Sequence, residues 1–125
     1  MRIRVYYEDT DAGGVVYHSR YLNFCERARS ELFFEKHPEI LEAARGHFLL
    51  ASVNAKFIKP AKLGDLLEVK NELLELKNAS VRLRQELFRQ KERLFSADFV
   101  LVFVKEGKAS AMSKELKSSF AKLFG

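Results

Sequence analysis

The sequence predicts an α+β domain in which one antiparallel sheet wraps over a single long helix. Two observations support this prediction. A stretch with helical periodicity, from Ser19 to Lys36, follows one short apolar segment near the start of the chain. After Gly46 the pattern changes to four extended segments joined by short turns. A twisted sheet of this width needs a cover for its concave face, and the Ser19–Lys36 segment is long and apolar enough to provide it.

The first two elements are a short strand and the long helix. The β-branched and aromatic residues from Ile3 to Tyr7 predict a strand, and the Asp, Thr and Gly residues from Glu8 to Gly14 predict a loop. Within the Ser19–Lys36 helix, apolar residues recur at spacings of three and four: Tyr21, Leu22, Phe24, Cys25, Ala28, Leu32 and Phe33. Pro38 ends this helix, and a short helical segment from Glu39 to Arg45 is expected next.

Four longer strands are predicted from the extended segments. They run from Phe48 to Ile58, from Leu66 to Leu76, from Ser80 to Gln90 and from Leu94 to Lys105. The third alternates apolar and polar residues, whereas Phe95 to Val104 is apolar on nearly both faces and predicts a central or interface strand. Ser113 is expected to cap a last helix with Leu116, Phe120 and Leu123 on one side.

Composition and charge limit the classes of function. The chain has 125 residues, of which 47% are hydrophobic and 31% charged, and this is typical of one globular domain spanning residues 1–125. The net charge of +5 is compatible with an anionic partner such as a phosphate group. Because the basic residues are interspersed with acids and form no long block, we expect no nucleic-acid partner.

Cysteine use and hydropathy predict a cytoplasmic protein without a membrane segment. The single cysteine, Cys25, rules out an intramolecular disulfide and lies on the apolar side of the predicted helix, where we expect a buried and inert thiol. The start of the chain, Met1 to Arg4, lacks the apolar stretch of a signal peptide. The longest apolar run, Phe99 to Val104, is far shorter than the ~18 residues that a membrane helix needs.

The residues that could carry chemistry lie between Tyr7 and Tyr21. Three carboxylates fall within four residues, and a Gly-Gly turn, His18 and the start of the long helix follow them. A carboxylate that faces a cleft can act as a base or a nucleophile. The same residues also fit an acidic turn in which Asp9 or Asp11 accepts a hydrogen bond from its own backbone. Spacing alone leaves both interpretations open.

Metal, phosphate-loop and serine hydrolase patterns do not fit this stretch. Asp9, Asp11 and Gly14 match three positions of an EF-hand loop, but Arg20 occupies the twelfth position, which needs a bidentate Glu. The three histidines lack zinc-ligand spacing, and neither a Gly-Lys-Ser/Thr nor a Gly-x-Ser-x-Gly motif is present. We therefore expect no metal and no cofactor.

One long motif resembles a known enzyme family. It reads Tyr-x-Asp-Thr-Asp-x-x-Gly-x-Val-Tyr-His-x-x-Tyr-x-x-Phe-x-Glu-x-x-Arg, from Tyr7 to Arg29 or its neighbour Arg27. This pattern is similar to the opening of the YbgC-type acyl-CoA thioesterases, relatives of 4-hydroxybenzoyl-CoA thioesterase. Residues Ser52 to Asp65 are similar to the family's second strand and turn, so the resemblance covers about residues 3–105. It implies a hotdog fold, an antiparallel sheet around a central helix, which agrees with the predicted order of elements.

The resemblance also implies an activity, the hydrolysis of acyl-CoA to a carboxylic acid and coenzyme A. Asp11 takes the position of the catalytic carboxylate, which would attack the thioester carbonyl or activate a water. His18 takes the position of the second catalytic residue, which would orient water, stabilise negative charge or protonate the leaving thiolate. Backbone N–H groups from Tyr17 to Arg20, at the helix start, are expected to be oxyanion donors.

The implied substrate needs a cationic site and an apolar slot. Coenzyme A carries a diphosphate and a 3′-phosphate, for which the candidates are Lys56, Lys59, Lys62, Arg82 and Arg84. Tyr17 is a further candidate for binding the substrate. The acyl chain would need an apolar slot, for which the candidates are Tyr21, Phe24, Phe57 and residues of a partner subunit.

Two other functions and an oligomeric state also follow from these residues. A hydratase or dehydratase of the same fold pairs an Asp with a His, but usually at a shorter spacing than that between Asp11 and His18. A non-catalytic module that binds acyl-CoA or acyl carrier protein is the second alternative. The apolar residues from Phe95 to Val104 exceed what one helix can cover, and a five-stranded sheet leaves an edge free. We therefore expect a homodimer formed by edge pairing, and further pairing to a homotetramer.

Overall fold

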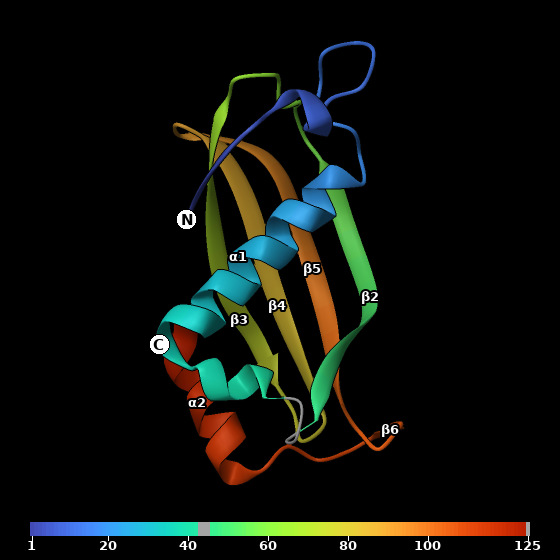
Figure 1. The fold of residues 1–125 in the computed structure, drawn as a ribbon, viewed down its shortest axis with the longest axis vertical. Coiled ribbons are helices and arrows are strands. Elements are labelled where there is room, and N and C mark those ends of the chain that lie inside the picture. The colour runs from blue at the N-terminus through green and yellow to red at the C-terminus, as the bar shows by residue number, and fades with distance from the viewer. Residues whose placement is uncertain (43–45, 125) are drawn as a thin grey trace.

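The structure, a computed structural model, describes residues 1–42 and 46–124. One curled antiparallel sheet wraps around helix α1 (Arg20–Lys36), which crosses its concave face diagonally (Figure 1). The strand order is β1 (Arg2–Arg4), β3 (Leu66–Leu76), β4 (Ser80–Arg89), β5 (Glu92–Lys105) and β2 (His47–Phe57). A two-residue strand that was not predicted, β6 (Lys108–Ala109), pairs with β5. The predicted α+β fold, a five-stranded antiparallel sheet around a central helix, is confirmed.

Helix α1 confirms the prediction to within one residue at its start. Six side chains at helical spacing are buried: Tyr21, Phe24, Cys25, Ala28, Arg29 and Phe33. Burial raises the pKa of the Cys25 thiol to about 12, as expected for an inert cysteine. The helix ends at Lys36, and a 3-10 turn, η2 (Pro38–Leu41), follows. Of the helical segment expected from Glu39 to Arg45, the described residues contain this short turn, and residues 43–45 lie outside the described residues.

The first strand is shorter than predicted. The expected strand from Ile3 to Tyr7 is wrong at its end, because β1 stops at Arg4 and a 3-10 turn, η1 (Tyr7–Asp9), begins at Tyr7. The side-chain Oδ2 of Asp9 accepts a hydrogen bond from the backbone N–H of Tyr6, at 2.9 Å. This bond folds the chain back on itself, so that Tyr7 leaves the sheet and is 83% exposed.

Alternation in the central strands sorts their residues onto two faces of the sheet. In β5, the odd-numbered residues from Phe95 to Phe103 are buried on the concave face, whereas Val100 and Val102 are half-buried on the outer face. The predicted central strand is confirmed, because β5 lies between β4 and β2.

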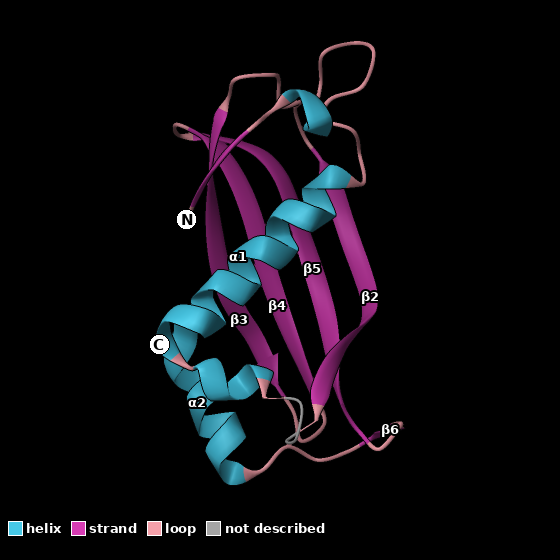
Figure 2. Ribbon diagram, viewed as in Figure 1, coloured by secondary structure: helices cyan, strands magenta, loops and turns pink. Residues whose placement is uncertain are grey.

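Two apolar clusters fill the space between the helices and the sheet. One surrounds Tyr21 and Phe24 in the first half of α1. The other joins Phe33 to the apolar side of α2 (Lys114–Phe124), which covers the lower end of the sheet (Figure 2). Ser113 caps α2 as predicted, since its hydroxyl accepts the N–H of Leu116 at 3.1 Å. Within the described part of the chain, neither helix has the length and apolarity to cross a membrane.

A buried polar group lies between the two clusters. The side-chain amide of Gln85, on β4, donates to the backbone carbonyl of Cys25 at 3.0 Å and to Oδ1 of Asn71 at 2.7 Å. Its Oε1 accepts a hydrogen bond from Nη1 of Arg29 at 2.8 Å. The guanidinium of Arg29 also lies over the ring of Phe99, 4.7 Å from its centroid. Gln85 therefore joins helix α1 to two strands of the sheet.

Replacing Gln85 with Leu should lower the free energy of unfolding by about 2–4 kcal/mol. The apolar side chain would leave Arg29, Asn71 and the carbonyl of Cys25 without their shared partner. Arg82→Ala, at an exposed position of the same strand, is the control and should change the free energy by less than about 0.5 kcal/mol. Urea unfolding followed by circular dichroism measures both, and equal effects would contradict the role of Gln85.

Candidate active site

The loop formed by residues 10–16 is fixed by a backbone hydrogen bond within the loop and by another to the segment after β2. Within the loop, the backbone N–H of Asp11 donates to the carbonyl of Val15 at 2.9 Å. From outside, the carbonyl of Ala61 accepts the N–H of Val16 at 2.8 Å. The loop that carries the Asp-Thr-Asp motif is thus positioned by the segment that connects β2 to β3.

The two aspartates of this motif lie in different surroundings. Asp9 is 4% exposed, and its Oδ1 accepts hydrogen bonds from Nε and Nη2 of Arg20 at 3.1 and 2.7 Å. Asp11 is exposed, and its Oδ1 accepts the backbone N–H of Gly13 at 2.8 Å. Its Oδ2 has no hydrogen-bond partner in residues 1–42 and 46–124. Of the two, Asp11 is the carboxylate that keeps one oxygen without a hydrogen-bond partner among the described residues.

The acidic-turn interpretation is also correct in its geometry. Asp9 and Asp11 each accept a backbone N–H within the turn, as short polar side chains do in loops. One oxygen of Asp11 remains free, so the turn and a chemical role are compatible. Among the residues that the structure describes, no three His, Cys, Asp or Glu side chains are placed to hold a metal ion.

A pocket of about 220 Å³ lies between the start of α1 and the end of β2. It is lined by Val16, His18, Tyr21, Phe57, Ile58, Lys59 and Pro60, and we call it the His18 pocket. His18 is exposed, with its ring centroid 4.2 Å from that of Tyr17. Tyr21 is buried, stacks on Phe95 at 4.9 Å, and accepts the N–H of Ala61 through its hydroxyl at 3.1 Å. The structure thus places His18 and Tyr21 in one pocket and the ring of Tyr17 beside His18.

Some of the backbone N–H groups at the start of α1 have a hydrogen-bond acceptor, and others have none among the described residues. That of Tyr17 donates to the carbonyl of Asp9, and that of Arg20 to the carbonyl of Tyr17, both at 2.9 Å. Those of His18 and Ser19 have no acceptor within the described part of the chain. The expected oxyanion donors between Tyr17 and Arg20 are therefore reduced to these two.

The structure separates the cations expected to bind phosphate. Lys59 lines the His18 pocket, but its Nζ donates to Oε2 of Glu92 at 2.6 Å. Lys56 lies on the outer face of the sheet, in a polar pocket of about 270 Å³ that it shares with Arg84 and Asp98. Arg84 forms a two-pronged ion pair with Asp98, at 2.8 and 3.1 Å. Lys56 and Lys59 thus line different pockets.

The remaining candidates for binding the phosphates and the acyl chain also lie in different parts of the structure. Arg82 is on the outer face, 3.7 Å from Glu75, whereas Lys62 is exposed in the segment that holds the loop and forms no ion pair within the described residues. Of the apolar candidates, Phe57 lines the His18 pocket and is 56% exposed. Phe24 is buried in the core and does not line that pocket.

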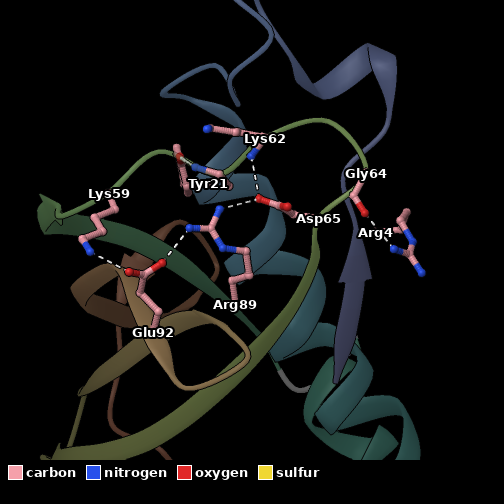
Figure 3. A network of polar contacts seen from close by, with 9 residues as sticks. Arg4, Tyr21, Lys59, Lys62, Gly64, Asp65, Arg89 and Glu92 are labelled. Atoms are coloured by element: carbon pink, nitrogen blue, oxygen red, sulfur yellow. Dashed lines mark hydrogen bonds and ion pairs between the residues drawn. The ribbon is translucent and has the colours of Figure 1, made fainter.

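A chain of ion pairs supports the segment between β2 and β3 (Figure 3). Arg89 donates to Asp65 at 2.8 Å and to Glu92 at 2.6 Å. Glu92 also accepts from Lys59, and the Asp65 oxygen that binds Arg89 also accepts the backbone N–H of Lys62. Hydrogen bonds from Lys59 and Arg89 hold the pKa of Glu92 below its usual value. The segment that positions the Asp11 loop is therefore itself fixed to the turn between β4 and β5.

Two residues that position this site, Arg20 and Arg89, belong to no recognised motif and were not predicted from the sequence. Arg20 begins α1, where the helix dipole disfavours a cation, so its position could have indicated an acidic partner nearby. Arg89 has no such signal, because Asp65 is distant in sequence and the ion pair depends on how the strands assemble.

Comparison with known proteins identifies the family. The model of the thioesterase superfamily matches residues 13–96, more than half of the chain. The chain belongs to the thioesterase superfamily. The acyl-CoA thioesterase YbgC of Helicobacter pylori is 53% identical over 72 residues, which are 58% of this chain and 53% of the relative. That of Haemophilus influenzae is 50% identical over 74 residues, which are 56% and 54%. The chain thus spans about half the length of the curated relatives it matches.

Solved structures agree with this assignment. A probable thioesterase from Bartonella henselae is 31% identical, with a TM-score of 0.79, and the match covers 90% of this chain and 96% of that one. A hypothetical protein from Aquifex aeolicus is 27% identical, with a TM-score of 0.89, and the match covers 95% and 96%. These matches confirm the resemblance to YbgC-type thioesterases and the hotdog fold that it implied.

Replacing Asp9 with Asn should lower the free energy of unfolding by about 1–3 kcal/mol, because Arg20 loses the partly buried carboxylate that accepts two of its hydrogen bonds. Asp11→Asn is the matched control and should change it by less than about 0.5 kcal/mol, since Asp11 is exposed. Chemical unfolding of the two variants and the parent measures the difference. A larger loss for Asp11→Asn would show that the two roles are reversed.

The Glu92 ion pairs should make stability depend on acid pH. A carboxyl whose pKa is depressed by folding adds stability that is present above its unfolded pKa and is lost as the pH falls through its folded pKa. We expect Glu92→Gln to be less stable than the parent at about pH 6 and to approach it at about pH 3. Urea midpoints across this range test the prediction, and two parallel curves would contradict it.

Proposed function

We propose that this chain hydrolyses acyl-CoA thioesters to a carboxylic acid and coenzyme A, with Asp11 as the reacting carboxylate and His18 assisting it. The observation that carries the proposal is the free oxygen of Asp11, on a fixed loop whose last residues lead into the His18 pocket. The names of the YbgC relatives support acyl-CoA as the substrate class. The apolar lining of the His18 pocket, with Tyr21 and Phe57, suits an acyl group.

Two chemical routes use the same residues. In the first, an oxygen of Asp11 attacks the thioester carbonyl carbon, the C–S bond breaks, and a mixed anhydride and the CoA thiolate form. The thiolate takes up a proton, and water then cleaves the anhydride to release the acid and restore the carboxylate. In the second, Asp11 accepts a proton from a water whose oxygen attacks the carbonyl, and that proton passes to the departing thiolate.

His18 and the free backbone donors would act on the charge that develops in either route. The N–H groups of His18 and Ser19 have no acceptor in the described residues and lie just before α1, where the helix dipole favours an anion. They would donate to the oxyanion of the tetrahedral intermediate. The imidazole of His18 would orient the water or protonate the thiolate. Neither route uses a metal or a cofactor.

Replacing Asp11 with Asn should lower kcat by at least about 100-fold, because the amide is neither a base nor a nucleophile. The unfolding free energy should stay near that of the parent. Release of free thiol from a panel of acyl-CoAs measures the rate, and parent-like turnover by the variant would reject Asp11. If the unsubstituted chain forms a hydroxyacyl product, the hydratase alternative holds instead, and binding without turnover favours the binding module.

His18→Ala separates transition-state action from binding. If the imidazole acts on the developing charge, kcat should fall more than KM rises. A rise in KM alone would assign His18 to substrate binding and would leave the role of Asp11 unaffected.

We also propose that two copies pair through the free edge of β2. This eleven-residue strand lies at one end of the sheet order and carries exposed Leu49 and Leu50 as well as Phe57. An edge of this length with apolar side chains favours pairing with another chain. Light scattering on the eluting protein should give the mass of a dimer, or of a tetramer if dimers pair further. A stable and fully active monomer at sub-micromolar concentration would contradict the pairing.

A further inference from the structure

A second pocket, of about 410 Å³, lies between α1 and the first half of β2. Its apolar lining includes Leu22, Phe33, Phe48, Leu50, Phe99 and Leu101. Because Arg29 also lines it, we call it the Arg29 pocket. Residues of α1 and of β2 line both this pocket and the His18 pocket.

Arg29 brings unused hydrogen-bond donors to this pocket. The side chain is 9% exposed, and Gln85 is its one hydrogen-bond acceptor among the described residues. No fully buried side-chain nitrogen or oxygen in the described structure lacks a partner. The other N–H groups of the guanidinium therefore reach accessible space, and the pocket that Arg29 lines is that space.

The charge of Arg29 is also incompletely balanced. No carboxylate of the described residues lies within ion-pair distance of it, and burial lowers its pKa. Glu26 lines the same pocket and is exposed, but its Oε1 is occupied by the hydroxyl of Ser30 at 2.8 Å. A cation in this position favours a ligand that offers an acceptor oxygen.

Small side chains of the sheet lie between the two pockets: Ala55 is half-buried and Ala97 is buried. Ala55 of β2 and Ala97 of β5 are direct neighbours in register on the concave face, between the residues that line the His18 pocket and those that line the Arg29 pocket. Tyr21 and Arg29 are eight residues apart in α1, or about 12 Å along its axis. An acyl group that begins in the His18 pocket and follows α1 would end beside Arg29.

We propose that the Arg29 pocket takes the far end of the acyl group, and that Arg29 selects acyl chains that carry an oxygen there, as a hydroxyl or a carboxylate. This inference rests on the proposed function. A chain that ends in a methyl group would displace water from the guanidinium without replacing its hydrogen bonds. A site with a buried donor discriminates against a ligand that lacks the acceptor.

The test compares acyl-CoAs of equal chain length that end in a methyl, a hydroxyl or a carboxyl group. For the unsubstituted chain, kcat/KM for the oxygen-bearing esters should exceed that for the methyl ester by about 10-fold or more once the chain is long enough to reach Arg29. Shorter esters should show no preference. A ratio near one at every length would overturn the proposal.

Arg29→Met removes the donors and keeps an unbranched side chain, so the long-chain ratio should fall to about one. Arg27→Met, at an exposed position of the same helix, is the matched control and should keep the ratio. A purely structural role of Arg29 would lower all rates by one factor and leave the ratio unchanged, which would contradict the proposal. If Arg29→Met does not fold, Ala55→Leu provides the test, because blocking the path should also abolish the long-chain preference.

Two further measurements separate the remaining outcomes. Glu26→Gln should raise the rate with the carboxyl ester relative to the hydroxyl ester, because it removes a like charge from the pocket. If no acyl-CoA is hydrolysed, the proposed function is rejected, but the role of Arg29 can still be tested. Calorimetry would then measure the binding of non-hydrolysable thioether analogues that end in a methyl, a hydroxyl or a carboxyl group. If Arg29→Met changes the mass in light scattering and leaves the ratio intact, a second copy occupies the pocket and the proposal is wrong.

Discussion

The position of helix α1 on the sheet depends on the side chain of Gln85. Apolar contacts alone hold a helix against a sheet without fixing its position along its axis, because neighbouring apolar surfaces are nearly equivalent. Gln85 removes this freedom, since it joins the backbone of Cys25 and the guanidinium of Arg29 to the sheet in the buried core. A helix shifted by one residue would leave these groups without partners. The start of α1, with His18 just before it, is thereby fixed opposite the end of β2.

A second set of hydrogen bonds fixes the loop of residues 10–16 relative to helix α1. Arg20, at the first residue of the fixed helix, binds Asp9, and the segment after β2 binds the backbone of Val16. Both carboxylate oxygens of Asp9 accept hydrogen bonds, whereas Oδ2 of Asp11 has no partner among the described residues. The difference between the two aspartates of the Asp-Thr-Asp motif thus follows from folding: Asp9 organises the loop, and Asp11 stays exposed to solvent.

The parts of this structure that could be predicted from sequence are those set by local periodicity and by the motif. Helical spacing predicted α1 to within a residue, and the extended segments predicted β2 to β5 closely. The end of β1 could not be predicted, because it depends on a bond from Tyr6 to Asp9. Gln85 falls at an inward position of an alternating strand, a signal that becomes informative only when its partners Arg29 and Asn71 are known. For Lys56 the signal was available, because alternation with Phe57 places it on the outer face.

The distribution of cations bears on how the proposed substrate, an acyl-CoA, would bind. The His18 pocket has one lysine in its lining, Lys59, and Glu92 neutralises it. Lys56 and Arg84 lie on the other face of the sheet, where Asp98 balances Arg84. The net charge of +5 is therefore not concentrated where the thioester would react. If the proposed substrate binds there, its phosphates would need cations from beyond the lining of that pocket, apart from Lys62. A second copy paired along β2 would bring its own basic residues to this edge, so the requirement for phosphate binding and the free strand edge both favour an assembled site.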